Sequence, residues 1–166
     1  GSSGNASLLP ELLAALGAVK VTALVSTAGA PVPTVAPDNV YLSPYLPGEE
    51  AVKLASLVIC NGGSPATHQA LIHGVPVIGV ANNLDQYLNM AAIAKAGAGC
   101  LLRAGTCDRR VLVATINSML SESTSREGAR ALATRFARYD AQERFPSIIN
   151  EISDKVGLRQ ELSTSP

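Results

Sequence analysis

The segment from Cys60 to Leu71 contains the residues of this chain that are best suited to bind an anion. An apolar run ends at Cys60, and two glycines, Ser64 and Pro65 follow it. Ser64 fits the N-cap of a helix, and Pro65 fits the first helical position, where a missing N–H costs least. A helix start offers unpaired N–H groups and the positive end of the helix dipole. The pattern predicts either an anion site or a plain strand-to-helix turn, because such a turn also needs glycine and a cap.

Two common phosphate-binding motifs do not match the sequence. A P-loop needs Gly-Lys followed by Ser or Thr, and the dinucleotide fingerprint needs Gly-x-Gly-x-x-Gly. Gly97-Ala98-Gly99 does not complete the second motif, because it precedes an expected strand and lacks the third glycine. The sequence therefore points away from both of these nucleotide-binding classes.

A second polar loop lies between Val80 and Asn89 and includes Asp85 and Gln86, where a helix is expected to begin. An acidic residue at that position complements the helix dipole. An adjacent Asp and Gln also supply acceptors and donors for the vicinal hydroxyls of a sugar. The spacing alone leaves both interpretations open.

The elements around these loops alternate between strands and helices. Apolar runs at 57–60 and 75–80 predict strands buried on both faces. Further strands are expected at 19–26, 40–42 and 99–102, and helices at 8–16, 49–55, 64–73, 85–96, 109–120, 123–139 and 145–156. This alternation predicts a doubly wound α/β fold with a parallel, Rossmann-like sheet covered on both faces. Ligands of such folds bind outside the carboxyl ends of the strands.

The composition excludes several functional classes. The 166 residues, 47% of them apolar, suffice for one domain, expected over residues 1–159 with a flexible tail at 160–166. Thirteen basic residues balance thirteen acidic ones, which disfavours a nucleic-acid binder and a polybasic membrane anchor. No apolar run reaches the ~18 residues of a transmembrane segment. Three cysteines without a Cys-x-x-Cys pair predict neither a disulfide framework nor a zinc site, so a cytoplasmic location is expected.

The combined motifs resemble the C-terminal, donor-binding half of the UDP-glycosyltransferase superfamily, whose members have the GT-B fold. Bacterial members show His-Gly-Gly-Ser-Gly-Thr-Thr-x-Glu-Ala-Leu, then Gly-Val-Pro, Asp-Gln-x-x-Asn-Ala and Gly-x-Gly. The matching segments here are 61–71, 74–76, 85–91 and 97–99, and their intervals match as well. Residues 1–4 resemble the glycine-serine loop after the first strand of that half, and this strand is expected before Gly1.

The resemblance implies a site for a UDP- or dTDP-sugar, used as a co-substrate without a metal or another cofactor. The segment 41–47 would cover the nucleobase. The residues implied at the site are Asn61, Gly63, Ser64, Ala66 and Thr67 for the diphosphate, Gln69 for the ribose, Asp85 and Gln86 for the sugar, and Ser2 and Ser3 for phosphate or nucleoside.

Three residues depart from the family pattern. Asn61 replaces the usual His, so that its amide donates without a charge. Pro65 has no N–H, which removes one possible phosphate donor. Gln69 replaces the Glu that holds the ribose hydroxyls, and an amide accepts more weakly than a carboxylate. The changes leave the donor class in place and the identity of the donor open.

The resemblance places no catalytic residue in this chain. The family's general base, a His oriented by an Asp, belongs to the N-terminal, acceptor-binding half. His68 and His73 read as surface residues of a helix, and Cys60 as an unreactive thiol. Cys107 precedes a helix, where a thiol can be reactive, but no nearby residue supports a role as nucleophile.

Several functions remain open at this stage. The first is the donor-binding part of an inverting, metal-independent glycosyltransferase, with the acceptor-binding half in the same chain. A donor-binding subunit of a two-chain transferase is the second. A sugar-nucleotide epimerase, or a binding module with a degenerate site, is the third.

Overall fold

The computed structural model describes residues 8–156 of the chain. The strands are β1 (Ala23–Ser26), β2 (Val40–Ser43), β3 (Val58–Cys60), β4 (Val77–Ala81) and β5 (Gly99–Arg103). The helices are α1 (Leu8–Leu16), α2 (Gly48–Leu54), α3 (Ser64–Ile72), α4 (Leu84–Lys95), α5 (Arg109–Ser121), α6 (Thr124–Ala137) and α7 (Ala141–Val156), and a 3-10 turn, η1, spans Ala104–Thr106. The predicted order of strands and helices is confirmed. Ser2, Ser3, the expected boundary at residue 159 and the expected tail at 160–166 lie outside the described residues.

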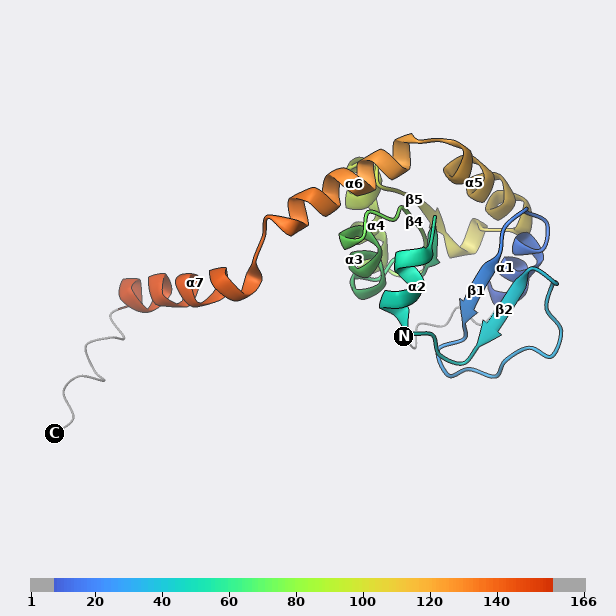
Figure 1. Cartoon of the computed structure of the whole chain (residues 1–166), viewed down its shortest axis with the longest axis horizontal. Coiled ribbons are helices and arrows are strands. Elements are labelled where there is room, and N and C mark those ends of the chain that lie inside the picture. Colours follow the sequence, from blue (N-terminus) through green and yellow to red (C-terminus); the bar gives the residue numbers. More distant parts are fainter. Residues whose placement is uncertain (1–7, 157–166) are drawn as a thin grey trace. The chain divides into compact units, whose positions relative to one another are not determined.

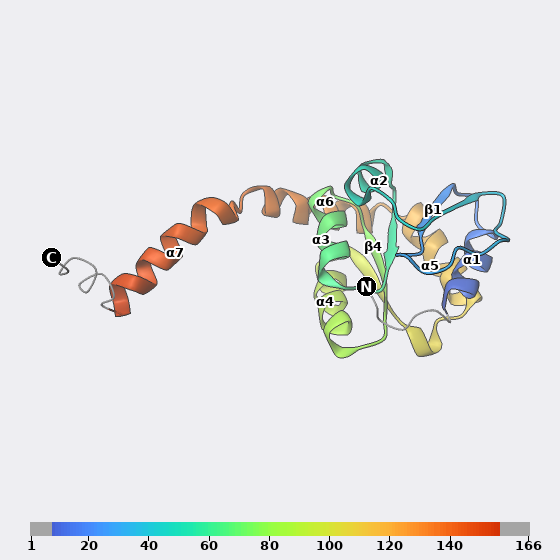
Figure 2. The same cartoon turned by 90° about the horizontal axis from the view of Figure 1, so that it is seen from below.

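All of these strands pair in parallel, as the predicted α/β fold class requires. Within residues 8–156 they form a two-stranded sheet, β1-β2, and a three-stranded sheet, β3-β4-β5. Helices α3 and α4 cover one face of the three-stranded sheet (Figures 1 and 2). Helices α1 and α5 pack together and share a hydrophobic core with the other face.

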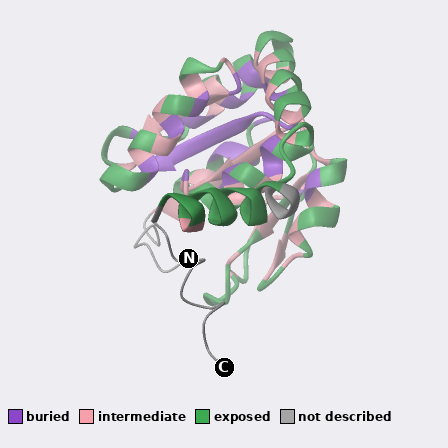
Figure 3. Cartoon of the chain, turned by 90° about the vertical axis from the view of Figure 1, so that its left-hand side faces the viewer, coloured by how far each residue is buried: buried purple, intermediate pink, exposed green. Residues whose placement is uncertain are grey.

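Strand β4 is the most buried element and separates the two helical layers (Figure 3). Ile78 and Val80, at most 1% exposed, pack into the core that includes Leu112 and Ile116 of α5. Gly79 lies between them in sequence and lies against Met90 of α4. The alternation follows from the pleat, which turns successive side chains to opposite faces of a sheet.

The prediction that the strand at 57–60 is buried on both faces is wrong, because β3 is only half-buried. It pairs with β4 on one side, and no strand among the described residues pairs with its other edge. Strand β1 is in the same situation, since β2 is its only partner in the described chain. Both edges therefore present main-chain groups that no described strand satisfies.

The strand predicted at 19–26 is shorter than expected and begins only at Ala23. The amide of Asn39 explains the difference. Its Nδ2 donates to the carbonyls of Leu16, Val19 and Val21 at 2.9, 3.3 and 2.9 Å. These three carbonyls are held in a turn at the end of α1, so the chain becomes extended only after them.

The chain divides into two compact units, the second of which begins at residue 135. Most of the second unit's described part is α7, an amphipathic helix as predicted. Its large apolar side chains are 45–66% exposed: Phe145, Ile148, Ile149 and Ile152. Among residues 8–156, no helix combines the length and the hydropathy that a membrane crossing requires.

Candidate functional site

The two predicted loops lie at the same edge of the sheet. Strands β3 and β4 are parallel neighbours, with Cys60 paired to Gly79, so that their carboxyl ends lie together. The first loop, 61–63, leads into α3, and the second, 82–83, leads into α4. The side chain of Asn89 on α4 joins the two, because its Nδ2 donates to the carbonyl of Gly62 at 2.7 Å.

The turn between β3 and α3 requires glycine at position 62. Gly62 has φ +81°, and an added Cβ would lie 2.6 Å from the Cγ of Met90. The N-cap of α3 is Gly63, so the prediction that Ser64 is the N-cap and Pro65 the first residue is wrong by one position. The reason is that the Gly63 carbonyl accepts the Thr67 N–H at 3.2 Å and so closes the first helical turn itself.

The N–H groups of this turn are divided between internal bonds and open positions. The Gly62 N–H donates to the Cys60 sulfur at 3.3 Å, and the Gly63 N–H donates to the Asn61 side-chain oxygen at 3.0 Å. Pro65 has no N–H. The N–H groups of Ser64 and Ala66 have no hydrogen-bond partner among residues 8–156. These two groups, with the Ser64 hydroxyl, are the donors that the turn can offer to an anion.

Thr67 lies beneath this turn rather than on its surface. Its side chain is 2% exposed. Its hydroxyl lies 3.1 Å from the Gly63 carbonyl and 3.2 Å from the Ser64 carbonyl, and it accepts a hydrogen bond from Asn89 at 2.9 Å. The structure therefore gives the Thr67 side chain a supporting position below the predicted diphosphate site.

The predicted ribose residue, Gln69, lies beside the start of α2. An added Cβ on Gly48 would be 2.8 Å from the Gln69 Oε1. The preceding segment carries the exposed Tyr41 and Tyr45, which are 61% and 72% exposed. The expected nucleobase segment, 41–47, therefore runs directly into the glycine that adjoins Gln69.

Two side-chain oxygens accept main-chain N–H groups at the start of α4. The Asn83 oxygen accepts the Gln86 N–H at 3.0 Å, and the Gln86 oxygen accepts the Asn82 N–H at 3.0 Å. This reciprocal pattern is close to a capping box. Gln86 is 4% exposed, whereas Asp85 is exposed. Of the two residues predicted to bind the sugar, Asp85 projects into solvent and Gln86 supports the helix start.

Asn89 is a residue of the site to which no role was assigned from the sequence. It lies four positions after Asp85, so both occupy one face of α4. That spacing is the signal that could have identified Asn89.

Arg103, at the carboxyl end of β5, adds a cation to this edge of the sheet. Its guanidinium lies 5.0 Å from the centre of the Tyr87 ring, and its Nη2 donates to the Tyr87 hydroxyl at 3.4 Å. Register pairs Arg103 with Ala81, the last residue of β4. Arg103 is not among the residues predicted from the sequence.

The histidines lie on the surface, and Cys60 and Cys107 are at least partly buried. His68 and His73 are exposed. Burial raises the pKa of the Cys60 thiol, and burial followed by the Asp108 charge raises the pKa of Cys107. Both thiols are therefore protonated at neutral pH and are weak nucleophiles. Within residues 8–156, no three His, Cys, Asp or Glu side chains are placed to hold a metal ion.

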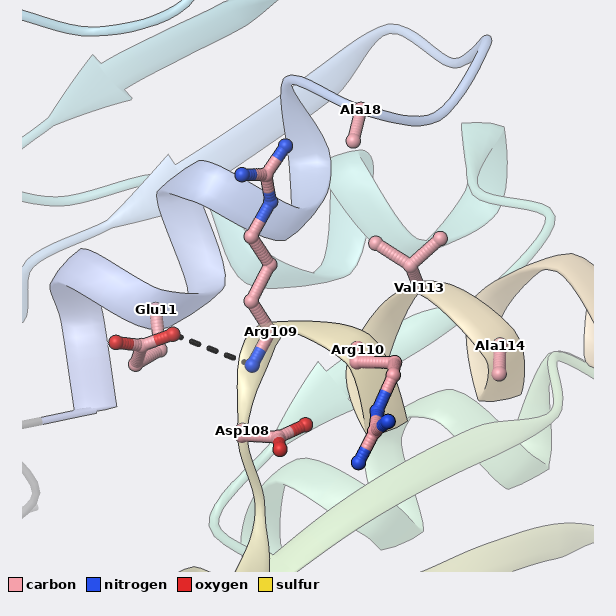
Figure 4. A pocket seen from close by; sticks show the side chains of 7 residues that line it. All are labelled: Glu11, Ala18, Asp108, Arg109, Arg110, Val113 and Ala114. Atoms are coloured by element: carbon pink, nitrogen blue, oxygen red, sulfur yellow. Dashed lines mark hydrogen bonds between the residues drawn. The ribbon is translucent and has the colours of Figure 1, made fainter.

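A shallow pocket between α1 and α5 contains none of the predicted site residues (Figure 4). There the Glu11 carboxylate accepts the N–H of Arg109 at 3.2 Å. Glu11 thereby adds a second anion to the start of α5, whose N-cap Asp108 accepts the Val111 N–H at 2.8 Å. Two N–H groups at this helix start are therefore already bonded to carboxylates.

The fold and the sequence comparisons identify the class of protein as the C-terminal domain of a GT-B glycosyltransferase. Over residues 10–149 the sequence matches the family model "Erythromycin biosynthesis protein CIII-like, C-terminal domain". The match covers most of the chain, and the chain belongs to this family. The family and the fold class predicted from the motifs are confirmed.

Curated relatives agree with this assignment. A PGL/p-HBAD biosynthesis rhamnosyltransferase of Mycobacterium bovis is 45% identical over 138 residues, 83% of this chain and 31% of the relative. An erythronolide mycarosyltransferase of Saccharopolyspora erythraea is 30% identical over 64% of this chain and 26% of the relative. The chain thus spans less than a third of the length of either relative.

Solved structures show the same fold. A spinosyn forosaminyltransferase superposes with a TM-score of 0.82 over 92% of this chain and 40% of its own, at 18% identity. A spinosyn rhamnosyltransferase complexed with thymidine diphosphate superposes with a TM-score of 0.70 over 82% of this chain and 38% of its own, at 26% identity.

Proposed function

We propose that this chain is the donor-binding part of a glycosyltransferase that moves a sugar from a dTDP-sugar, or a UDP-sugar, to an acceptor hydroxyl. One observation carries the proposal. The start of α3, with the unpaired N–H groups of Ser64 and Ala66, lies at the same sheet edge as the exposed Asp85. An anion-binding helix start beside an exposed carboxylate suits a sugar diphosphate.

The diphosphate would lie over the first turn of α3, and Asp85 would accept hydrogen bonds from hydroxyls of the sugar. The ribose would lie near Gln69, and the nucleobase near the segment 41–47. Thymidine diphosphate is favoured over UDP, because a solved relative at 26% identity carries it. The rhamnosyl and mycarosyl transfers named for relatives favour a deoxysugar as the transferred group.

The proposed reaction inverts the anomeric centre. The acceptor oxygen attacks the anomeric carbon from the face opposite the diphosphate, and a base outside this chain takes the proton of the hydroxyl. The carbon–oxygen bond to the diphosphate breaks, and the electron pair leaves with the diphosphate. The dipole of α3 and its N–H groups stabilise this charge, so the proposal requires no metal ion. This mechanism rests on the family resemblance.

The acceptor-binding half is the proposed partner, either in the same chain or in another. A cytoplasmic location belongs to the same proposal. The free thiols of Cys60, Cys100 and Cys107 in the described chain support it, because they suit a reducing compartment.

The test is a calorimetric titration of this chain with dTDP, UDP and ADP. Saturable binding of dTDP that is tighter than that of UDP and ADP is the expected result. Ala66→Pro removes one unpaired N–H within the first helical turn, where proline is tolerated, and should weaken dTDP about tenfold. Binding of none of the three at millimolar concentration would contradict the proposal.

One observation favours a second candidate, a binding module whose donor site has degenerated. The Asn61 oxygen already occupies the Gly63 N–H, and Pro65 supplies none, so the turn offers fewer donors than a full phosphate cradle. In that case dTDP binding would be absent in wild type and would appear when Asn61 is replaced by His, the residue of the family pattern.

A further inference from the structure

We propose that Asn89 is a positioning residue that holds the phosphate-binding turn in shape from α4, an inference that rests on the proposed function. The side chain of Asn89 touches that turn at two points. Its Nδ2 lies 2.7 Å from the Gly62 carbonyl and 2.9 Å from the Thr67 hydroxyl. A side-chain amide has two N–H donors, and here each has its own acceptor.

Along the chain, one acceptor precedes and the other follows the residues that would face the diphosphate. Gly62 precedes the helix start, and Thr67 lies in its first turn. The Thr67 hydroxyl donates its single proton toward the carbonyls of Gly63 and Ser64, so its remaining capacity is as an acceptor for Asn89. Asn89 thus fixes the turn from both ends while Ser64 and Ala66 keep their N–H groups unpaired.

Packing gives the same contact a second anchor. Met90, the next residue of α4, is fully buried and lies against Gly62 and Gly79. The Gly62 carbonyl is therefore held by Asn89 while its Cα is held by Met90. Asp85 lies one helical turn before Asn89. Helix α4 therefore positions both the Asp85 carboxylate, proposed to bind the sugar, and the turn proposed to bind the diphosphate. The sugar and diphosphate parts of the proposed site are thus connected through α4.

The chemistry requires an amide at position 89. A carboxylate has no N–H and would oppose both the Gly62 carbonyl and an incoming diphosphate. A leucine of similar size donates to neither acceptor. Asn89→Asp and Asn89→Leu should therefore both weaken dTDP binding, and Asn89→Asp should weaken it more.

The first measurement uses the free chain and needs no ligand. Amide hydrogen exchange by NMR should show the Thr67 N–H, which bonds to the Gly63 carbonyl at 3.2 Å, exchanging about tenfold faster in Asn89→Leu. Leu88→Ala, at an exposed neighbouring position of α4, is the matched control and should leave that rate unchanged. Unchanged exchange in Asn89→Leu would overturn the proposal.

The second measurement separates positioning from a general loss of structure. Asn89→Leu should raise the Kd for dTDP about tenfold and leave the Kd for thymidine, which has no phosphate, unchanged. Equal losses for both ligands would reduce Asn89 to a structural role and would overturn the proposal. If wild type bound no dTDP, the proposed function would fail, and the exchange rates alone would decide the role of Asn89.

A variant of Thr67, the partner of Asn89, keeps the proposal testable if Asn89→Leu misfolds. Thr67→Val keeps the shape of the side chain and removes the hydroxyl that accepts from Asn89. It should weaken dTDP in the same way, and the double variant Asn89→Leu/Thr67→Val should lose less than the product of the two single losses. Full additivity of the two changes would contradict a shared role.

Discussion

Asp85 is the residue on which the binding of a sugar, as distinct from a nucleotide, should depend. It is exposed at the second residue of α4, with its neighbour Gln86 buried beneath it. Hydrogen bonds to charged groups contribute about 1.5–3 kcal/mol each. The two residues, adjacent in the motif, therefore have different structural positions and should differ in their effects on binding.

Replacing Asp85 by Asn should discriminate between ligands. We expect the Kd for a dTDP-sugar to rise about tenfold, because the charged acceptor for sugar hydroxyls is lost, and the Kd for dTDP to stay the same. Isothermal titration with both ligands measures this. Asp38→Asn, an exposed change just before the amino end of β2, is the control. Equal weakening of both ligands would exclude a role toward the sugar.

Replacing Asn61 by His should make dTDP binding depend on pH. An imidazolium attracts the diphosphate, and an unperturbed histidine is charged below about pH 6.5. Relative to Asn61→Ala, the His variant should bind dTDP about tenfold more tightly at pH 5.5, and the gain should decline as pH rises through the imidazole pKa. His68 is present in both variants, so the comparison isolates the effect of position 61. A gain that is the same at pH 5.5 and 8.5 would exclude a charge effect.

At the scale of elements, the contact between β4 and α4 fixes the position of the helix that carries Asp85. Gly79 in β4 lies against Met90, which is fully buried, so that an added methyl group has no space. Parallel strands buried on both faces leave little room for adjustment, because protein interiors are close-packed. Glycine is required here by the close approach of a helix rather than by its backbone freedom.

Gly79→Ala should therefore destabilise the fold by about 1–3 kcal/mol through overpacking. The matched control is Gly105→Ala in η1, where an added Cβ meets no atom within 4 Å. Urea unfolding followed by circular dichroism compares the two variants. Equal midpoints for Gly79→Ala and Gly105→Ala would show that α4 can move away from the sheet without cost.

At the scale of the whole molecule, burial differs strongly between the two units. Ile116 of α5 is 1% exposed in the core of the first unit, and Ile152 of α7 is 51% exposed in the second. The same amphipathic pattern therefore produces a buried face in one helix and an open face in the other.

The same isoleucine-to-valine change should have different effects on the free energy of unfolding in α5 and in α7. Ile116→Val removes one methylene from a closed core and should lower the free energy of unfolding by about 0.5–1.5 kcal/mol. Ile152→Val should change it by less than about 0.5 kcal/mol, because that side chain is half exposed already. Thermal unfolding of both variants tests this. A comparable loss in Ile152→Val would show that the apolar face of α7 is covered.

The sequence by itself determined the elements, the fold class and the family. Periodicity, glycine stops and buried apolar runs are local signals, and they placed helices such as the one at 109–120 within one residue of its observed bounds. The motif intervals at 61–71 and 85–91 likewise identified the two loops. These features could be predicted because each depends on residues that are close together in the chain.

Only the tertiary structure decided how the site is held together. Asn39 shortens β1 by binding three carbonyls about twenty residues away, and β3 is half-buried at the edge of the described three-stranded sheet. Thr67 lies beneath the turn, and Asn89 bonds to Thr67 and to Gly62, which are 22 and 27 residues away in the sequence. Such contacts depend on which elements lie side by side. The spacing of Asn89 four positions after Asp85 indicates a shared helix face, but not the groups that Asn89 contacts. The physical reason is that hydrogen-bond satisfaction is settled among neighbours in space, whereas periodicity reports only neighbours in sequence.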